Sequence, residues 1–180
     1  TMAGHIVYIT TPSSLVVLDL DDPLKPKLIQ KIEMKDPRAS ALQFRYLFVT
    51  DAEGLKVFDA TQPKNIKPVS GAHIALKNPN KLYVARTYAY VAAGSDGLAI
   101  INIKSPEKPK LYKLFNANGK INDARDVIVG TTNASLFAYV ADGKNGLKVI
   151  QLTSPDSQPR FYGYSPEPKP ELIAWKKTKY

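Results

Sequence analysis

The sequence predicts an all-β fold built from one unit repeated four times. Two observations predict it. A nine-residue phrase recurs four times in phase along the 180 residues, and a β-rich run containing an aromatic residue precedes each copy across a short turn. No segment shows a sustained helical period, so strands are expected throughout.

The repeated phrase begins with a leucine and ends with a proline. The leucines are spaced by 40, 43 and 49 residues, and each proline follows its leucine by eight residues. The phrases are LVVLDLDDP, LKVFDATQP, LAIINIKSP and LKVIQLTSP, beginning at Leu15, Leu55, Leu98 and Leu147. Because proline cannot donate a backbone hydrogen bond to a sheet, we expect it to end each strand.

A second strand precedes each phrase and is expected to form a hairpin with it. Its aromatic anchor lies seven or eight residues before the leucine, at Tyr8, Phe48, Tyr90 and Tyr139. The connections read PSS, DAEG, GSDG and DGKNG. Glycine adopts positive φ at little steric cost, and Asp or Asn can close a turn with its side chain.

Two further strands complete each unit. Outer strands follow the proline, as in KPKLIQKI and KPKLYKLF, and inner strands precede the hairpin, as in RASALQF, KLYVAR and ARDVIVG. Aligning the inner strands places Ser40, Leu82 and Val127 at one position. Four strands in 40 to 49 residues are the signature of a β-propeller blade, whose apolar residues pack blade against blade.

We therefore expect one β-propeller domain or propeller fragment over residues 1–180, made of four-stranded antiparallel blades. The blade units are expected at about 1–35, 36–72, 73–118 and 119–165, with no inner strand in the first. Residues 166–180 are expected to give an inner strand to the next or the first blade. A closed four-bladed ring and a ring completed by a second chain both fit this offset, but we favour a piece of a larger propeller.

The phrases resemble the LVIVD repeat family. LVVLD, LKVFD, LAIIN and LKVIQ stand where that family has the run that names it, and the resemblance extends over roughly residues 5 to 175. The first copy departs from the pattern with PSS in place of glycine, and the last two with Asn102 and Gln151 in place of aspartate. The resemblance implies an extracellular, cell-surface or periplasmic propeller protein of bacteria or archaea, and it brings no general set of catalytic residues.

Composition narrows the function classes. The net charge is +9, yet only five of the 25 basic residues are arginine, and they are scattered. Nucleic-acid readers favour arginine, whereas scattered lysine is typical of solvated strand edges, so we expect no nucleic-acid partner. No apolar run reaches 18 residues, so no membrane span is expected. The absence of cysteine excludes disulfides, thiolate catalysis and c-type haem attachment within this segment.

Charged residues before the inner strands form the candidate binding site. Asp123, Arg125 and Asp126 precede or begin the last inner strand, while Arg38 and Lys81 stand before the other two. Loops at this end of a blade open at the mouth of the central channel, so we expect these residues to lie near one another. Their mixed charge suits a small anion or a peptide. A local salt-bridge network that holds the loop is the alternative.

No catalytic, cofactor-binding or metal-ligating residue is predicted. The two histidines, His5 and His73, lack metal-site spacing, and His73 is expected in a linker. Asp51, Asp96 and Asp142 lie in hairpin turns without the dense acidic spacing of a calcium loop, so turn closure is the expected role.

The sequence thus favours a non-catalytic scaffold that binds a protein partner. Further domains of the same chain, or another copy of it, would complete the ring. The alternative is the propeller portion of a larger enzyme, or of a multihaem electron-transfer protein of the cell surface. In that case the active groups lie outside this segment, which itself is expected to carry no cofactor.

Overall fold

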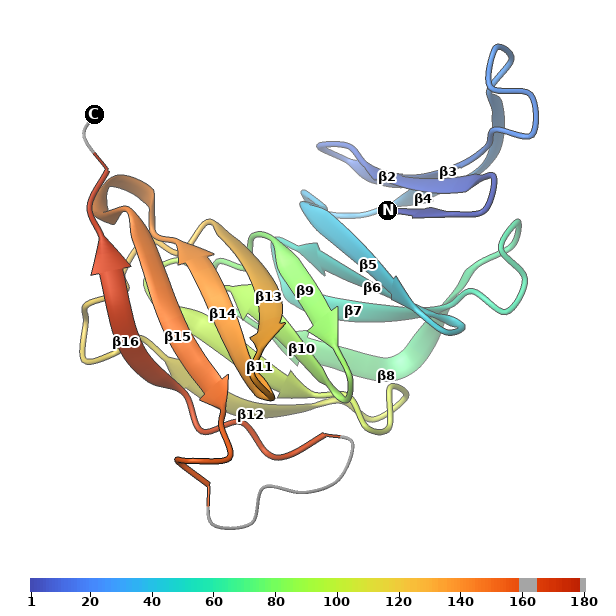
Figure 1. Ribbon diagram of the computed structural model, residues 1–180. Helices are drawn as coiled ribbons and strands as arrows, with labels where there is room; N and C mark the ends of the chain where they lie inside the picture. The colour runs from blue at the N-terminus through green and yellow to red at the C-terminus, as the bar shows by residue number, and fades with distance from the viewer. Residues whose placement is uncertain (159–164, 179–180) are drawn as a thin grey trace.

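The chain forms four antiparallel sheets of four strands each in a computed structural model, which describes residues 1–158 and 165–178 (Figure 1). This architecture confirms the predicted all-β fold of four-stranded blades. The strands are β1 Met2–Ala3, β2 Ile6–Thr10, β3 Ser14–Asp19, β4 Lys27–Glu33, β5 Ala39–Gln43, β6 Tyr46–Asp51, β7 Gly54–Asp59, β8 Lys67–Ala75, β9 Leu82–Ala85, β10 Tyr88–Ala92, β11 Leu98–Asn102, β12 Lys110–Phe115, β13 Asp126–Thr132, β14 Ser135–Ala141, β15 Leu147–Thr153 and β16 Glu171–Lys176.

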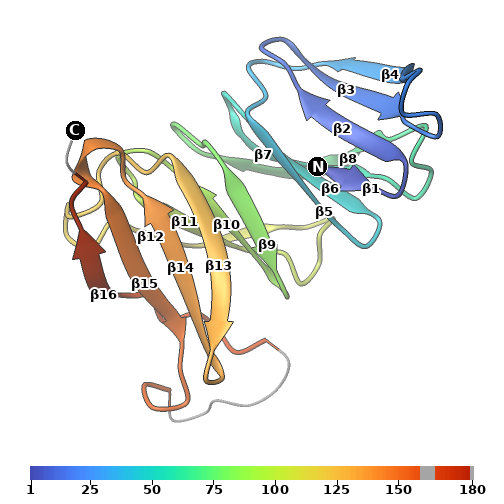
Figure 2. The ribbon, with the colours of Figure 1, turned by 45° about the horizontal axis from the view of Figure 1, so that its top comes forward.

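The blades follow one another round an arc (Figures 1 and 2). Blade 1 holds β1 to β4, blade 2 β5 to β8, blade 3 β9 to β12 and blade 4 β13 to β16, each ordered from inner to outer strand. The inner strand β9 contacts both β5 and β13, so the inner strands line a shared channel. In residues 1–158 and 165–178, no helix has the length and apolar character needed to cross a membrane.

The observed register matches the predicted alignment of the inner strands. Ser40 pairs with Val49, Leu82 with Val91 and Val127 with Val140, each partner being the residue after an aromatic anchor. The last hairpin is closed by a short 3-10 turn, Gly143–Asn145. Blade 4 keeps this register although its inner hairpin is longer, because β13 and β14 are extended by the same number of residues.

Three expectations about strand placement were wrong. Glu171–Lys176 is the outer strand of blade 4, paired with β15, and not an inner strand of the next or first blade. The repeat pattern did not predict this pairing, because a long, proline-containing connection separates this strand from β15. In the other blades the connection between the third and the outer strand is short. Blade 1 does have an inner strand, since Met2 pairs with Val7. This strand has only two residues, too few to show an alternating pattern in the sequence. His73 lies in β8, which runs past the expected boundary at residue 72.

Residues 159–164, at the end of the fourth predicted unit, and residues 179 and 180 lie outside the described residues.

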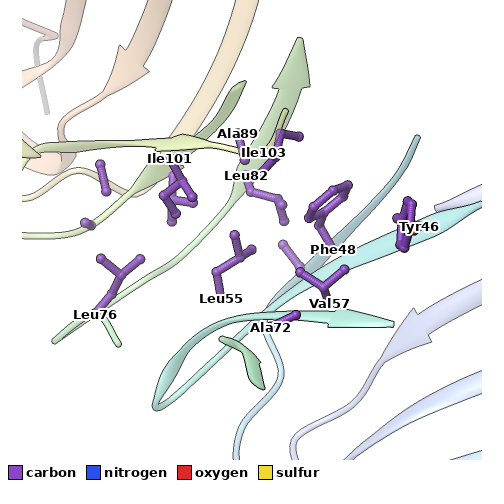
Figure 3. Packing of buried hydrophobic residues seen from close by; sticks show 14 residues of the cluster. Tyr46, Phe48, Leu55, Val57, Ala72, Leu76, Leu82, Ala89, Ile101 and Ile103 are labelled. Carbon is purple, nitrogen blue, oxygen red and sulfur yellow. The ribbon is translucent and has the colours of Figure 1, made fainter. Parts of the chain in front are cut away.

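Apolar side chains from neighbouring blades form the core. Three clusters occupy the joints between blades 1 and 2, 2 and 3, and 3 and 4. At the middle joint, Phe48 and Leu55 of blade 2 face Ala89 and Ile101 of blade 3, and all four are buried (Figure 3). Burying a side chain as large as Phe or Leu contributes roughly 1.5–3 kcal/mol, so the joints supply much of the stability.

Polar contacts also tie blade 1 to blade 2. The Gln30 side chain donates to the carbonyl of Ile66 at 3.0 Å and accepts from its amide at 2.9 Å. Lys64 Nζ lies 2.7 Å from Asp19 Oδ2. The hydrogen bond from Lys64, with a backbone bond from Asp21, lowers the pKa of Asp19.

Candidate functional site

Three inner strands begin at the same register at one end of the blades. The amides of Arg38, Asn80 and Arg125 donate to the carbonyls of Thr50, Ala92 and Ala141, at 2.8, 2.7 and 2.8 Å. These three carbonyl residues each lie two positions after an aromatic anchor. The repeat therefore places Arg38, Asn80 and Arg125 at equivalent positions round the channel mouth.

The structure brings three of the five predicted site residues into one cavity. Arg38, Lys81 and Arg125 line a cavity of about 380 Å³ at the channel mouth. Its remaining lining residues are Thr10, Thr11, Pro12, Asp36, Pro37 and Asn80. Blade 1 contributes Thr10 and Thr11 and blade 4 contributes Arg125, so the cavity draws on all four blades.

Arg38 is held in place by three hydrogen bonds. Its Nη1 donates to Asn78 Oδ1 at 2.7 Å and to the Pro79 carbonyl at 2.8 Å, and its Nε donates to Asp36 Oδ2 at 2.9 Å. The side chain is 28% exposed. Arg38 therefore ties the mouth of blade 2 to the loop before blade 3, while part of its guanidinium still faces the cavity.

The acidic members of the predicted site take two different positions. Asp123 Oδ1 accepts from Arg125 Nε at 2.5 Å, and it is not among the residues that line the cavity. Asp126 lines the adjoining stretch of channel, a second cavity of about 380 Å³ to which Lys81 also contributes. The Oδ1 atom of Asp126 accepts from the Val127 amide at 2.7 Å.

Asn80 lines the same cavity but was not among the residues predicted from the sequence. Its carbonyl accepts from Thr50 Oγ1 at 2.6 Å, and its Nδ2 donates to the Ala124 carbonyl at 2.9 Å. Asn80 thus links blades 2, 3 and 4 at the cavity. The signal was present, because Arg38, Asn80 and Arg125 each stand two residues before the aligned Ser40, Leu82 and Val127.

The resulting site carries mixed charge, and part of it is held in a fixed geometry. Two of its three cations are paired with carboxylates, Arg38 with Asp36 and Arg125 with Asp123. In the described residues, Lys81 has no hydrogen bond or ion pair from its side chain. Such a surface offers donors to a carboxylate or a peptide carbonyl, but it lacks the run of unpaired cations that a phosphate backbone requires.

Groups suited to metal or acid–base chemistry lie apart in the described part of the chain. No group of three His, Asp or Glu residues there could hold a metal ion. His5 lies 3.7 Å from Asp19 in blade 1, while His73 is on the outer strand of blade 2. Neither histidine lines the two channel cavities.

A family model of the LVIVD repeat matches residues 80–116 and 123–163. These segments lie in blades 3 and 4 and include the inner strands β9 and β13, with Lys81 just before β9 and Asp126 at the start of β13. No curated protein sequence matches this chain.

Solved structures with the same fold have little sequence in common with this chain. A computationally designed protein, Ika4, is 12% identical, with a TM-score of 0.59 over 84% of this chain and 88% of its own. Kluyveromyces lactis Hsv2 is 18% identical (TM-score 0.50), and the N-terminal domain of Nup159 is 12% identical (TM-score 0.52). Each of these two β-propeller proteins is matched over 86% of this chain, which spans 44% of theirs. The chain thus has a β-propeller fold, and two of its segments, in blades 3 and 4, match the LVIVD repeat.

Proposed function

We propose that this chain is a non-catalytic propeller scaffold that binds a protein partner at its channel mouth. One observation carries the proposal: Arg38, Lys81 and Arg125, from three different blades, line one cavity in which two of the cations are fixed by carboxylates. Fixed donors with little net charge suit a peptide segment that bears a carboxylate. The two guanidinium groups held by carboxylates also lose little entropy on binding.

The proposal includes an exported or cell-surface location and no cofactor in this segment. The location follows from the resemblance of the repeats to the LVIVD family. Digestion of intact source cells with an added protease tests the cell-surface location, because a protein on the surface is cleaved and a protein inside the cell envelope is protected.

Binding is tested by replacing the exposed cations at the mouth. We expect the double variant Lys81→Glu, Arg125→Gln to retain the partner roughly tenfold less well in affinity capture from the source organism. The loss of one charge-assisted contact of about 1.4 kcal/mol has this effect. Circular dichroism should show that the variant is folded.

A matched control removes charge from the opposite end of blade 3. Lys104 and Lys108 are exposed in the connection between β11 and β12. The variant Lys104→Glu, Lys108→Gln should bind the partner as the unaltered protein does. Equal loss in both variants would mean that general charge, and not the channel mouth, governs binding. Retention of the partner by the mouth variant would contradict the proposal.

A further inference from the structure

Among the residues that the structure describes, the sheets at the two ends of the arc each have one apolar face without a neighbouring blade (Figures 1 and 2). We define the leading face as the side of blade 4 that points away from blade 3. It carries Phe137, Tyr139, Leu147 and Val149, while the residues between them pack into the joint with blade 3. The trailing face is the side of blade 1 that points away from blade 2, and it carries Val7, Ile9 and Leu18.

The leading face has the residues of a regular joint. Leu147 is 40% exposed, whereas its repeat equivalents in the first three blades are 0% exposed. Phe137, Tyr139 and Val149 are likewise half-buried at positions that are buried in every other blade. The buried equivalents in blades 1 to 3 are Ile6, Tyr46 and Tyr88 for Phe137; Tyr8, Phe48 and Tyr90 for Tyr139; Leu15, Leu55 and Leu98 for Leu147; and Val17, Val57 and Ile100 for Val149.

The trailing face supplies the opposite half of the same joint. Ile9 is 41% exposed, whereas its equivalents in blades 2 to 4 are 0% exposed. Val7 and Leu18 are half-buried, and their equivalents are also buried. These buried equivalents are Val49, Val91 and Val140 for Ile9; Leu47, Ala89 and Ala138 for Val7; and Phe58, Ile101 and Ile150 for Leu18.

An exposed leucine lies at the same end of the arc. Leu24 follows Pro23 as Lys64 follows Pro63, and Lys64 is the residue that bridges blade 2 to Asp19 of blade 1. Leu24 is 90% exposed. The position equivalent to Asp19 in blade 4 is Gln151, which is uncharged. A joint between blade 4 and blade 1 would therefore have uncharged side chains where the first internal joint has an ion pair.

Each copy of the chain carries both halves of this joint. We propose that two copies join head to tail, with the leading face of each against the trailing face of the other, and close a ring of eight blades. Copies joined through two different surfaces form a closed ring when the rotation from one copy to the next completes a full turn. Two copies give eight blades, within the usual range of four to eight, whereas three would give twelve. The proposal does not depend on binding at the channel mouth.

The mass of the protein in solution tests the stoichiometry. For this chain of 19.9 kDa, native mass spectrometry or light scattering should give twice the mass measured after denaturation. A native mass of one copy would overturn the proposal. A longer natural chain whose further blades cover the two faces would also give the mass of one copy, and this result would overturn the proposal too. Three or more copies would overturn the closed ring of two.

Variants of each face test the head-to-tail arrangement. Ile9→Glu blocks the trailing face and Leu147→Glu blocks the leading face, so each variant alone should be a single copy. Mixed together, they should form a pair through the one joint whose faces are both unaltered. If instead two leading faces or two trailing faces met, one of the two variants would still form a pair by itself. Mixing the variants would then produce no new pair, and this result would overturn the head-to-tail arrangement.

Two further variants keep this test decisive. Phe44 is 88% exposed in the turn between β5 and β6, away from both faces, so Phe44→Glu should still form a pair of copies. If Leu147→Glu fails to fold, Phe137→Glu blocks the same face from another strand.

Discussion

At the scale of single residues, the glycine before the repeat leucine is fixed by the neighbouring outer strand. Gly97 has φ +77°, and a Cβ added there would lie 2.4 Å from the carbonyl oxygen of Phe115. Gly54 and Gly146 meet the carbonyls of Ile74 and Lys176 in the same way, at 2.0 and 2.1 Å. The Gly-Leu pair of the repeat is therefore a consequence of how closely the outer strand passes the hairpin.

Substitution of Gly97 tests this reading. We expect Gly97→Ala to lower the free energy of unfolding by about 1–2 kcal/mol for the positive φ and by about 1–3 kcal/mol more for the clash with the outer strand. Gly119→Ala is the matched control, because Gly119 has φ +82° and an added Cβ there would have no atom of the described residues within 4 Å. Urea unfolding should show a larger loss for Gly97→Ala, and equal losses would contradict the role of the carbonyl.

At the scale of elements, the aspartates of two hairpins have different tasks. Asp51 closes its own turn, accepting from the amides of Glu53 and Gly54 at 2.9 and 3.1 Å. Asp142 instead accepts from the amides of Asn122 and Asp123, at 3.1 and 2.7 Å. The hairpin of blade 4 thereby fixes the loop that leads into the channel mouth.

Asp142 is fully buried, and its Oδ2 lies 3.7 Å from Lys148 Nζ, whose side chain is only 8% exposed. Removing one member of a buried ion pair leaves the other charge unpaired. We therefore expect Asp142→Ala to lower the free energy of unfolding by about 3–5 kcal/mol. Asp96→Ala, in the corresponding hairpin of blade 3, is the control in urea unfolding, and a similar cost for both would rule out this account.

At the scale of the whole molecule, the joints couple the ionisation of tyrosine to stability. Tyr88 is buried at the joint of blades 3 and 4 and packs edge-on to Tyr112, with ring centroids 5.7 Å apart. Burial, helped by the charge of Glu167, raises the pKa of Tyr88 to about 12. Burial raises the pKa of Tyr90 as well.

These shifts predict that stability falls at alkaline pH. An unfolded tyrosine loses its proton near pH 10, while folded Tyr88 keeps its proton until about pH 12. The stabilisation is therefore complete below pH 10 and is lost as the pH rises from 10 towards 12. Urea unfolding at pH 9, 10 and 11 should show this fall, and Tyr88→Phe should make it shallower. Tyr83→Phe, at an exposed side chain, should leave it unchanged; an equal effect of both would refute the assignment.

Much of the blade architecture could be predicted from particular residues. The leucine, the proline eight residues later and the aromatic anchor placed the central hairpins, and the alignment of Ser40, Leu82 and Val127 gave the register of the inner strands. These features are local, because alternation and turn chemistry act within a few residues. The outer strand of blade 4 was missed because a long connection separates it from β15, and pairing across such a distance leaves no local pattern.

The sequence by itself determined the repeat, the hairpins and the apolar positions that become joints, because each depends on near neighbours in the chain. Only the tertiary structure decided which charged residues meet. It placed Asn80 beside Arg38 and Arg125 in one cavity, and it placed Lys81 and Asp126, from neighbouring blades, in another. The physical reason is that these contacts depend on how one blade is oriented against the next, and that orientation is set by packing of side chains far apart in sequence.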